Sequence, residues 1–163
     1  MYLFWGNNSN NMESELKLLK VSITNVLALV KNLSNQQLNE IPNSSSNNLI
    51  WHLGHLVVTH KLLIYGLSGN DLGLETNFVD QFKKGSKPNV NVSENECETI
   101  KNKLKAIFLE LEDDLKKDIF KTFKKYPTSY NFEITNLNDA ISFNNLHFGL
   151  HVGSILKLKK QIK

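Results

Sequence analysis

Two histidines near the C-terminal end of the sequence have a spacing that suits metal binding. They are His147 and His151, in the segment HFGLHVGS at residues 147–154. Residues four apart lie on one face of an α-helix, so the two imidazoles can reach the same ion. Such an ion can lower the pKa of bound water to about 7 for hydrolysis, or hold a thiolate ready to attack an electrophile. At least one further ligand must come from another part of the chain.

A second segment supplies candidates for that ligand. The stretch WHLGHLVVTH, residues 51–60, contains His52, His55 and His60. On a helix, His52 and His55 lie on adjacent edges, and the spacing does not choose between them. The competing interpretation is that the histidines belong to the core, where an imidazole commonly bonds to a carbonyl or a hydroxyl group. The presence of all five histidines in two apolar segments, where each one costs desolvation energy, raises the odds of metal binding and leaves both interpretations open at this point.

Other catalytic signatures are absent from the sequence. There is no HExxH motif, and no Glu-x-x-His pair of the kind found in di-iron bundles. There is also no GxSxG motif, phosphate-binding loop or dinucleotide fingerprint. No carboxylate adjoins the histidines, so a general base would come from a distant segment. Asp71, Glu75 and Asp80 are examples, among which the sequence does not choose.

Four long helices are predicted to position these histidines. Apolar residues recur at intervals of three and four over residues 12–33 and 47–67, and Gly69 is suited to end the second helix. A capping box at 93–96, SENE, begins the third helix, whose end is not defined by the pattern. Asn136 or Asn138 can cap the fourth, which runs to about Gln161. His147 and His151 share its apolar stripe with Ala140, Phe143, Ser154, Leu158 and Ile162.

The segments between these helices complete the fold prediction. Residues 70–92 show no sustained periodicity and are longer than neighbouring antiparallel helices need. A brief extended piece is expected at 131–134. The sequence therefore predicts an all-α fold, a four-helix bundle with a long crossover connection between helices two and three.

Length and composition limit the remaining possibilities. The 163 residues are enough for one domain, expected at 12–163 after a flexible N-terminal arm at 1–11. All 19 basic residues are lysine, and the net charge is only +3, which argues against a nucleic-acid partner. No uncharged apolar run reaches membrane length, which argues against a membrane partner. The single cysteine, Cys97, is interpreted as a surface thiol and fits a cytoplasmic location.

Three segments resemble the DinB-like (DinB/YfiT) superfamily. They are NNLIWHLGHLVVTHKLLIYGLSG, FKKGSKP and LNDAISFNNLHFGLHVGSILKLKK, in this order, and the resemblance covers roughly residues 12–162. It implies a four-helix bundle that holds a divalent metal through one histidine of the second helix and two of the last. Those positions correspond to His55, His147 and His151 here, with His52 as a neighbour or substitute. The sequence departs from the family pattern at Ser154, where the family commonly has Gln.

The resemblance also implies a range of activities. Characterised relatives include metal-dependent transferases for low-molecular-weight thiols and proteins proposed as hydrolases. We therefore expect a metal-dependent enzyme that acts on a small molecule, or a non-catalytic small-molecule-binding or interaction module with a lapsed site. Three imidazoles favour zinc or nickel, and acidification toward pH 5 should expel the ion because histidine has an ordinary pKa of about 6.5. A homodimer is expected, with Phe4, Trp5, Phe120 and Phe123 as apolar groups that a partner could cover.

Overall fold

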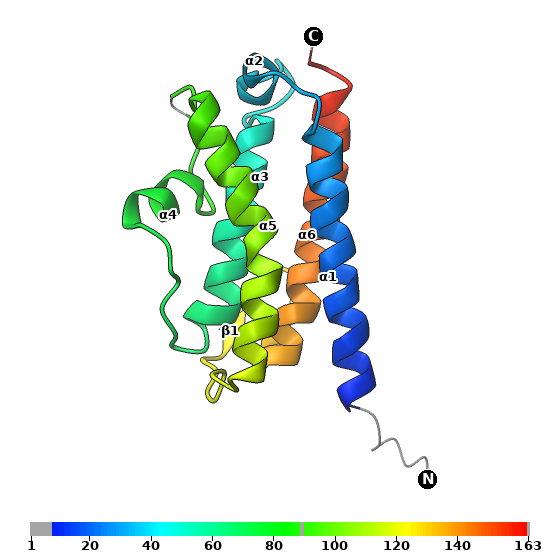
Figure 1. Cartoon of the computed structure of the whole chain (residues 1–163), viewed down its shortest axis with the longest axis vertical. Helices are drawn as coiled ribbons and strands as arrows, with labels where there is room; N and C mark the ends of the chain where they lie inside the picture. Colours follow the sequence, from blue (N-terminus) through cyan, green and yellow to red (C-terminus); the bar gives the residue numbers. More distant parts are fainter. Residues whose placement is uncertain (1–7, 89, 163) are drawn as a thin grey trace.

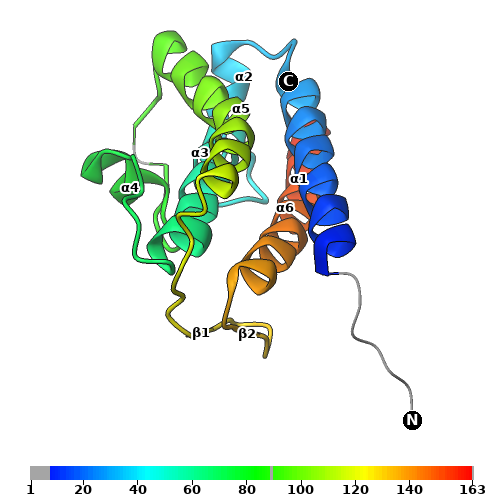
Figure 2. The ribbon, with the colours of Figure 1, turned by 60° about the horizontal axis from the view of Figure 1, so that its bottom comes forward.

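Four long helices pack side by side in the computed structural model, which describes residues 8–88 and 90–162 (Figure 1). They are α1 (Asn8–Val30), α3 (Leu49–Lys61), α5 (Glu94–Lys116) and α6 (Leu137–Lys159). Helix α1 contacts α5 and α6, and α3 contacts the same two helices, so the histidine-bearing helices α3 and α6 are neighbours (Figure 2). The prediction of an all-α fold is confirmed.

Apolar residues at helical spacing form the core between these helices. On α5 they are Ile100, Leu104, Ile107 and Leu111, each nearly inaccessible to solvent. Burying a side chain of this size stabilises the fold by about 1.5–3 kcal/mol. Helix α3 is more deeply placed, because twelve of its thirteen residues are buried. Its histidines therefore lie inside the protein rather than on its surface.

The helix ends follow the capping signals of the sequence. The Ser93 hydroxyl accepts a hydrogen bond from the Glu96 backbone N–H, and the Glu96 carboxylate accepts one from the Ser93 N–H, which completes the predicted capping box. Asn136 caps α6 through the Asp139 N–H. At Gly69, φ is +77°, a conformation that glycine adopts without strain and that ends the second helical segment.

Several boundaries differ from the prediction. Helix α1 begins at Asn8 instead of Met12, so residues 8–11 of the predicted arm are helical, while residues 1–7 lie outside the described part of the chain. The second predicted helix continues beyond α3 as a π-helix, η1 (Leu62–Gly66). A short helix, α2 (Asn35–Asn39), begins at a capping box that Ser34 and Gln37 form.

The long connection between η1 and α5 also contains a helix. This is α4 (Thr76–Phe82), where the sequence shows no sustained periodicity. Its last residue, Phe82, is buried against α3. After α5, the strands β1 (Tyr126–Pro127) and β2 (Glu133–Ile134) form an antiparallel pair that includes part of the expected extended piece. Both connections contribute residues to the cavity described below.

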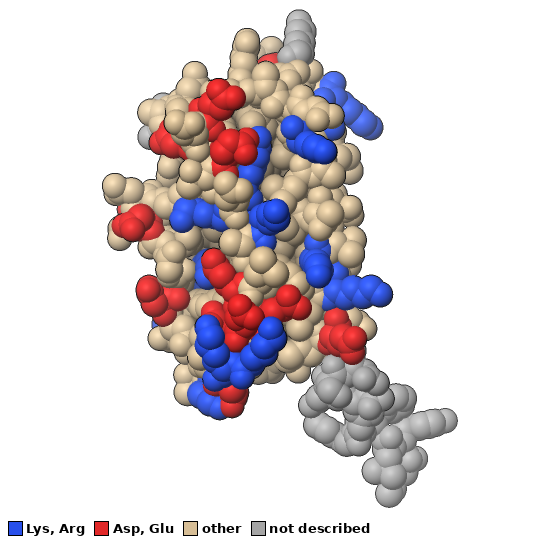
Figure 3. All heavy atoms as spheres, viewed as in Figure 1, with Lys and Arg blue, Asp and Glu red and all other residues tan. Residues whose placement is uncertain are grey.

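Several predictions concern the surface. On the face shown in Figure 3, lysines lie among acidic side chains. No helix within the described ranges has both the length and the apolar character needed to cross a membrane. Cys97 is buried, contrary to the surface position predicted for it. Phe120 and Phe123 are half-buried against the core, and Phe4 and Trp5 lie outside the described residues, so the homodimer stays a prediction.

Candidate metal centre

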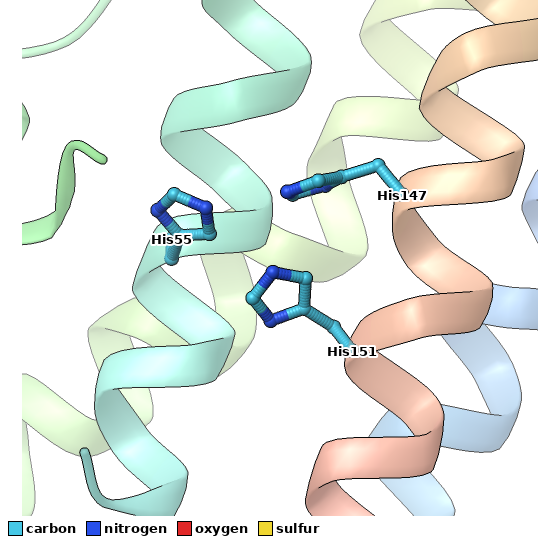
Figure 4. Close-up of side chains that lie close together, drawn as sticks. All are labelled: His55, His147 and His151. Carbon is cyan, nitrogen blue, oxygen red and sulfur yellow. The ribbon is translucent and has the colours of Figure 1, made fainter. Parts of the chain in front are cut away.

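His55 of α3 and His147 and His151 of α6 come together at the interface between the two helices (Figure 4). Each imidazole offers one nitrogen, and the three nitrogens lie within 4.8 Å of one another. The ring centroids are 5.1 Å apart for His55 and His147, 4.9 Å for His55 and His151, and 4.4 Å for His147 and His151. With metal–nitrogen bonds of about 2.0–2.1 Å, small side-chain rotations bring three such nitrogens to one ion.

The orientation of His55 is set by its neighbours. Its Nδ1 lies 2.7 Å from the backbone carbonyl oxygen of Phe82. Because a carbonyl only accepts hydrogen bonds, Nδ1 carries the proton and Nε2 keeps a free lone pair. The Trp51 indole stacks on the ring, with centroids 4.6 Å apart and planes inclined by 9°. The Thr59 hydroxyl lies 3.2 Å from Nε2, where a metal ion would replace this contact.

His52 contacts His151 but is not one of the three clustered histidines. The Nδ1 atoms of the two rings are 2.7 Å apart, so one of them donates a hydrogen bond to the other. If His151 offers Nε2 to an ion, its Nδ1 must carry the proton, and His52 is then the acceptor. The structure thus gives the two histidines of WHLGH different positions. His55 lies beside His147 and His151, and His52 lies one contact further away.

One nitrogen of the cluster lacks a partner. The Nδ1 atom of His147 is buried and has no hydrogen-bond partner among the described residues. Leaving a buried polar atom unpaired costs about 1–3 kcal/mol, and native structures rarely do so. Nε2 of His60, outside the cluster, is buried and unpaired as well, so the fit to an ion rests on the three imidazole nitrogens within 4.8 Å of one another and not on this atom.

The three clustered imidazoles are held in the neutral form that metal ligation requires. Burial, with help from the neighbouring histidines, lowers the pKa of His147 to about 4 and that of His151 to about 2. Burial also lowers the pKa of His55, to which the Lys84 ammonium contributes. At pH 7 the rings therefore need not lose protons before they bind a metal ion.

His60 is placed as a core histidine. It is fully buried, and its Nδ1 lies 3.2 Å from the side-chain nitrogen of Asn144. It is not part of the three-histidine cluster. The core interpretation of the sequence therefore suits His60, while the metal interpretation suits His55, His147 and His151.

A cavity of about 680 Å³ opens beside the clustered histidines. Its wall is mainly apolar, with hydroxyl groups from the segment around β1 and two lysines, Lys84 and Lys124. Asp71, Glu75 and Asp80, the acidic residues considered as distant bases, are not among its lining residues. The apolar wall is formed by Leu62, Leu63, Leu67, Phe143 and Leu150, and the hydroxyls by Thr59, Tyr126, Thr128, Ser129 and Tyr130.

Ser154, the departure from the family pattern, does not line this cavity. Its hydroxyl donates a hydrogen bond to the Leu150 carbonyl oxygen, at 3.1 Å, within its own helix. The replacement of Gln by Ser therefore leaves the three clustered imidazoles in place.

The sequence does not identify the Phe82 carbonyl or the two lysines of the cavity as parts of the site, because these groups lie in connections that show no periodicity.

Comparison with known proteins agrees with this architecture. No curated protein matches the sequence. The sequence model of the DinB superfamily matches residues 18–155, which include all three clustered histidines and most of the four long helices. Because this match covers most of the chain, the protein belongs to the DinB superfamily.

Proposed function

We propose that this protein binds one divalent metal ion through His55, His147 and His151 and is an enzyme that acts on a small molecule held in the adjacent cavity. The observation that carries the proposal is the convergence of three neutral imidazoles on the wall of a cavity large enough for a substrate. Three nitrogen ligands suit zinc or nickel. Three protein ligands also leave a coordination position open, as in catalytic metal sites.

Each neighbouring group has a definite part in this arrangement. When bound, the ion would supply a Lewis acid that activates water or a substrate thiol. The Phe82 carbonyl and the Trp51 ring hold His55 with Nε2 toward the cluster. With an ion bound to Nε2 of His151, Nδ1–H of His151 would donate a hydrogen bond to Nδ1 of His52, which fixes this tautomer. The leucines and Phe143 shield the substrate from water.

Of the two reaction types in the family, transfer of a low-molecular-weight thiol has the better support. The residues that line the cavity include no carboxylate, so they offer no Asp or Glu side chain to take a proton from water during hydrolysis. A thiol has an ordinary pKa of about 8.5 and can release its proton to solvent on binding, before an electrophile reacts. We therefore place a thiol substrate ahead of an ester or amide.

Metal analysis of protein purified without a chelator tests the site. We expect about one zinc or nickel ion per chain in the wild type and in Ser154→Ala, and a loss of the ion in His147→Ala and His151→Ala. Ser154→Ala is the matched control because it changes the same helix outside the cluster. Equal metal content in all four proteins would overturn the assignment.

Turnover measurements then test the reaction. The metal-loaded protein is supplied with thiols and electrophiles in one panel, and with esters and amides in another. Metal-dependent thiol consumption that His151→Ala abolishes is the expected result. Hydrolysis of the second panel alone would contradict the proposed reaction type, and stoichiometric metal with no turnover in either panel would instead indicate a non-catalytic binding module.

A further inference from the structure

The charged side chains of the cavity are all of one sign. Lys84, which follows α4, and Lys124, which precedes β1, line it, and no Asp or Glu does. Elsewhere in the described ranges, lysines pair with carboxylates in six ion pairs, for example Lys61 with Glu110 and Lys101 with Glu98. Neither cavity lysine takes part in any of these. Both lysines are exposed to solvent, and they line a mainly apolar space whose lining residues include no carboxylate.

The two lysines lie toward different ends of the cavity. Lys84 is near the three clustered histidines, because it lies two residues after Phe82, whose carbonyl oxygen is 2.7 Å from Nδ1 of His55. Lys124 is at the other end, because its backbone N–H donates a hydrogen bond of 2.7 Å to the Leu67 carbonyl oxygen. His55 and Leu67 both line the cavity, and at 1.5 Å per helical residue they are roughly 18 Å apart along α3 and η1. The space is therefore elongated, with a cation toward each end.

The wall between these ends is apolar. Leu62, Leu63 and Leu67 come from η1 and the residue after it, and Phe143 and Leu150 come from α6. A ligand that fills this space gains from burying apolar surface, about 25 cal/mol for each Å². An anionic group on the same ligand gains further from a lysine ammonium group, by the modest amount typical of solvent-exposed charge pairs.

From this arrangement we propose that the cavity selects an elongated, mainly apolar small molecule with an anionic group at one end, a carboxylate or a phosphate, whose charge is held by Lys84 or by Lys124. Naming this molecule as the substrate rests on the proposed function. The charge preference itself rests only on the cavity. It makes the two lysines specificity-determining residues, which distinguish an anion from a neutral or cationic molecule of the same shape.

Binding of three probes to metal-free protein measures this preference. Decanoate, decanamide and decylamine have the same apolar chain and differ in charge, and calorimetric titration gives the affinity of each. Metal-free protein has no ion beside the cavity to attract an anion, so the two lysines are the charged residues among those that line it. We expect decanoate to bind about fivefold more tightly than decanamide, and decylamine to bind most weakly.

Paired lysine variants assign the preference to the cavity. The double variant Lys84→Met and Lys124→Met should bind decanoate and decanamide with similar affinity, while decanamide binding stays within about twofold of the wild type. The control is Lys87→Met with Lys121→Met, three residues away in the same two connections. Of these two, Lys121 already pairs with Asp118. This control should keep the preference for decanoate.

The outcomes separate this inference from the proposed function. Equal binding of decanoate and decanamide to the wild type, no binding of any probe, or equal losses in the two double variants would overturn the charge preference. Metal content is measured separately, on protein without probe. A chain that selects decanoate but binds no metal would overturn the proposed function and leave the charge preference in place, and a chain that binds metal without selecting decanoate would do the reverse.

Discussion

At the scale of single residues, the two histidines of WHLGH differ in what their Nδ1 atoms contact. Nδ1 of His55 donates to a backbone carbonyl, which orients the ring toward the cluster. Nδ1 of His52 faces Nδ1 of His151. An imidazole that accepts a hydrogen bond from the N–H of a metal-binding histidine fixes the tautomer of that histidine without contacting the ion. In the proposed metal site, His52 is therefore a positioning residue and His55 a ligand.

Replacing His52 tests this division. His52→Leu removes the acceptor for His151, and we expect zinc affinity to fall about 10–100-fold, without the complete loss expected for His151→Ala. In His52→Gln the amide oxygen can accept the same hydrogen bond, so part of the affinity should return. A chelator competition assay measures the affinities. Wild-type affinity in His52→Leu would contradict the role, and equal losses in the Leu and Gln variants would point to packing instead.

The sequence predicted the three clustered histidines better than the groups that orient them. Helical spacing placed His147 and His151 on one face, and the resemblance to the DinB-like superfamily favoured His55 over His52. The contact that orients His55 comes from a backbone carbonyl, at Phe82. Every residue has a carbonyl group, so no residue type marks this one. The contact between His52 and His151 depends on the helix packing, which spacing along one helix does not define.

At the scale of elements, the short helix α4 links fold and site. Its Phe82 side chain packs against α3 at Gly54, while the Phe82 carbonyl oxygen accepts a hydrogen bond from His55, the next residue of α3. Trp51 reaches the same region, because its Nε1 donates a hydrogen bond to the Ser86 hydroxyl at 3.0 Å. The presence of glycine at position 54, in WHLGH, thus has a structural explanation. It lets the Phe82 ring approach the backbone of α3.

Gly54→Ala tests this link between α4 and the metal site. A Cβ atom at this position would lie 2.4 Å from the nearest atom of the Phe82 ring, and that ring is buried. The ring must move, so we expect a loss of about 1–3 kcal/mol in the free energy of unfolding. We also expect weaker zinc binding, since the Phe82 carbonyl moves with the ring. Urea unfolding and chelator competition measure the two effects.

Gly153→Ala is the matched control for this substitution. A Cβ atom there meets no heavy atom within 4 Å, so alanine should stabilise α6 by about 0.5–1 kcal/mol and leave zinc affinity unchanged. If Gly54→Ala were as stable and bound zinc as tightly as this control, the docking of α4 would have no bearing on His55.

The elements that the sequence missed are short ones. Periodicity needs several turns to be visible, and it predicted the helices that correspond to α1, α3, α5 and α6. Helix α2 has five residues and α4 has seven, so their faces repeat too few times to show a pattern. The capping box at Ser34 was a usable signal for α2. No comparable side-chain cap begins α4 at Glu75, and its position depends on the fit of Phe82 against Gly54.

At the scale of the whole molecule, the proposed ion would connect α3 to α6 across the interior. An ion that binds only the folded state stabilises it by mass action, by about 2.7 kcal/mol at a free concentration 100 times Kd. For a domain of this size, that corresponds to a rise of roughly 8 °C in Tm. We expect this rise on adding zinc or nickel to chelator-treated protein at pH 7.5, and none in His147→Ala.

The burial of the ligands changes the pH at which the ion should leave. The ordinary pKa of histidine, about 6.5, predicts loss of the ion toward pH 5. In the folded protein, however, the pKa of His147 is lowered to about 4 and that of His151 to about 2, chiefly by burial. Protons therefore compete weakly with the ion at pH 5.5, and we expect release only near pH 4.

Thermal melts at pH 7.5, 5.5 and 4, each with chelator and with added metal, check this prediction. With chelator, stability should be highest above pH 6.5 and fall below it, because the unfolded histidines take up protons while the buried ones, with their lowered pKa values, stay neutral. The rise in Tm due to metal should persist at pH 5.5 and vanish near pH 4. A metal-dependent rise that disappears by pH 5.5 would mean that the ligands titrate as exposed histidines, which is incompatible with a site buried between α3 and α6.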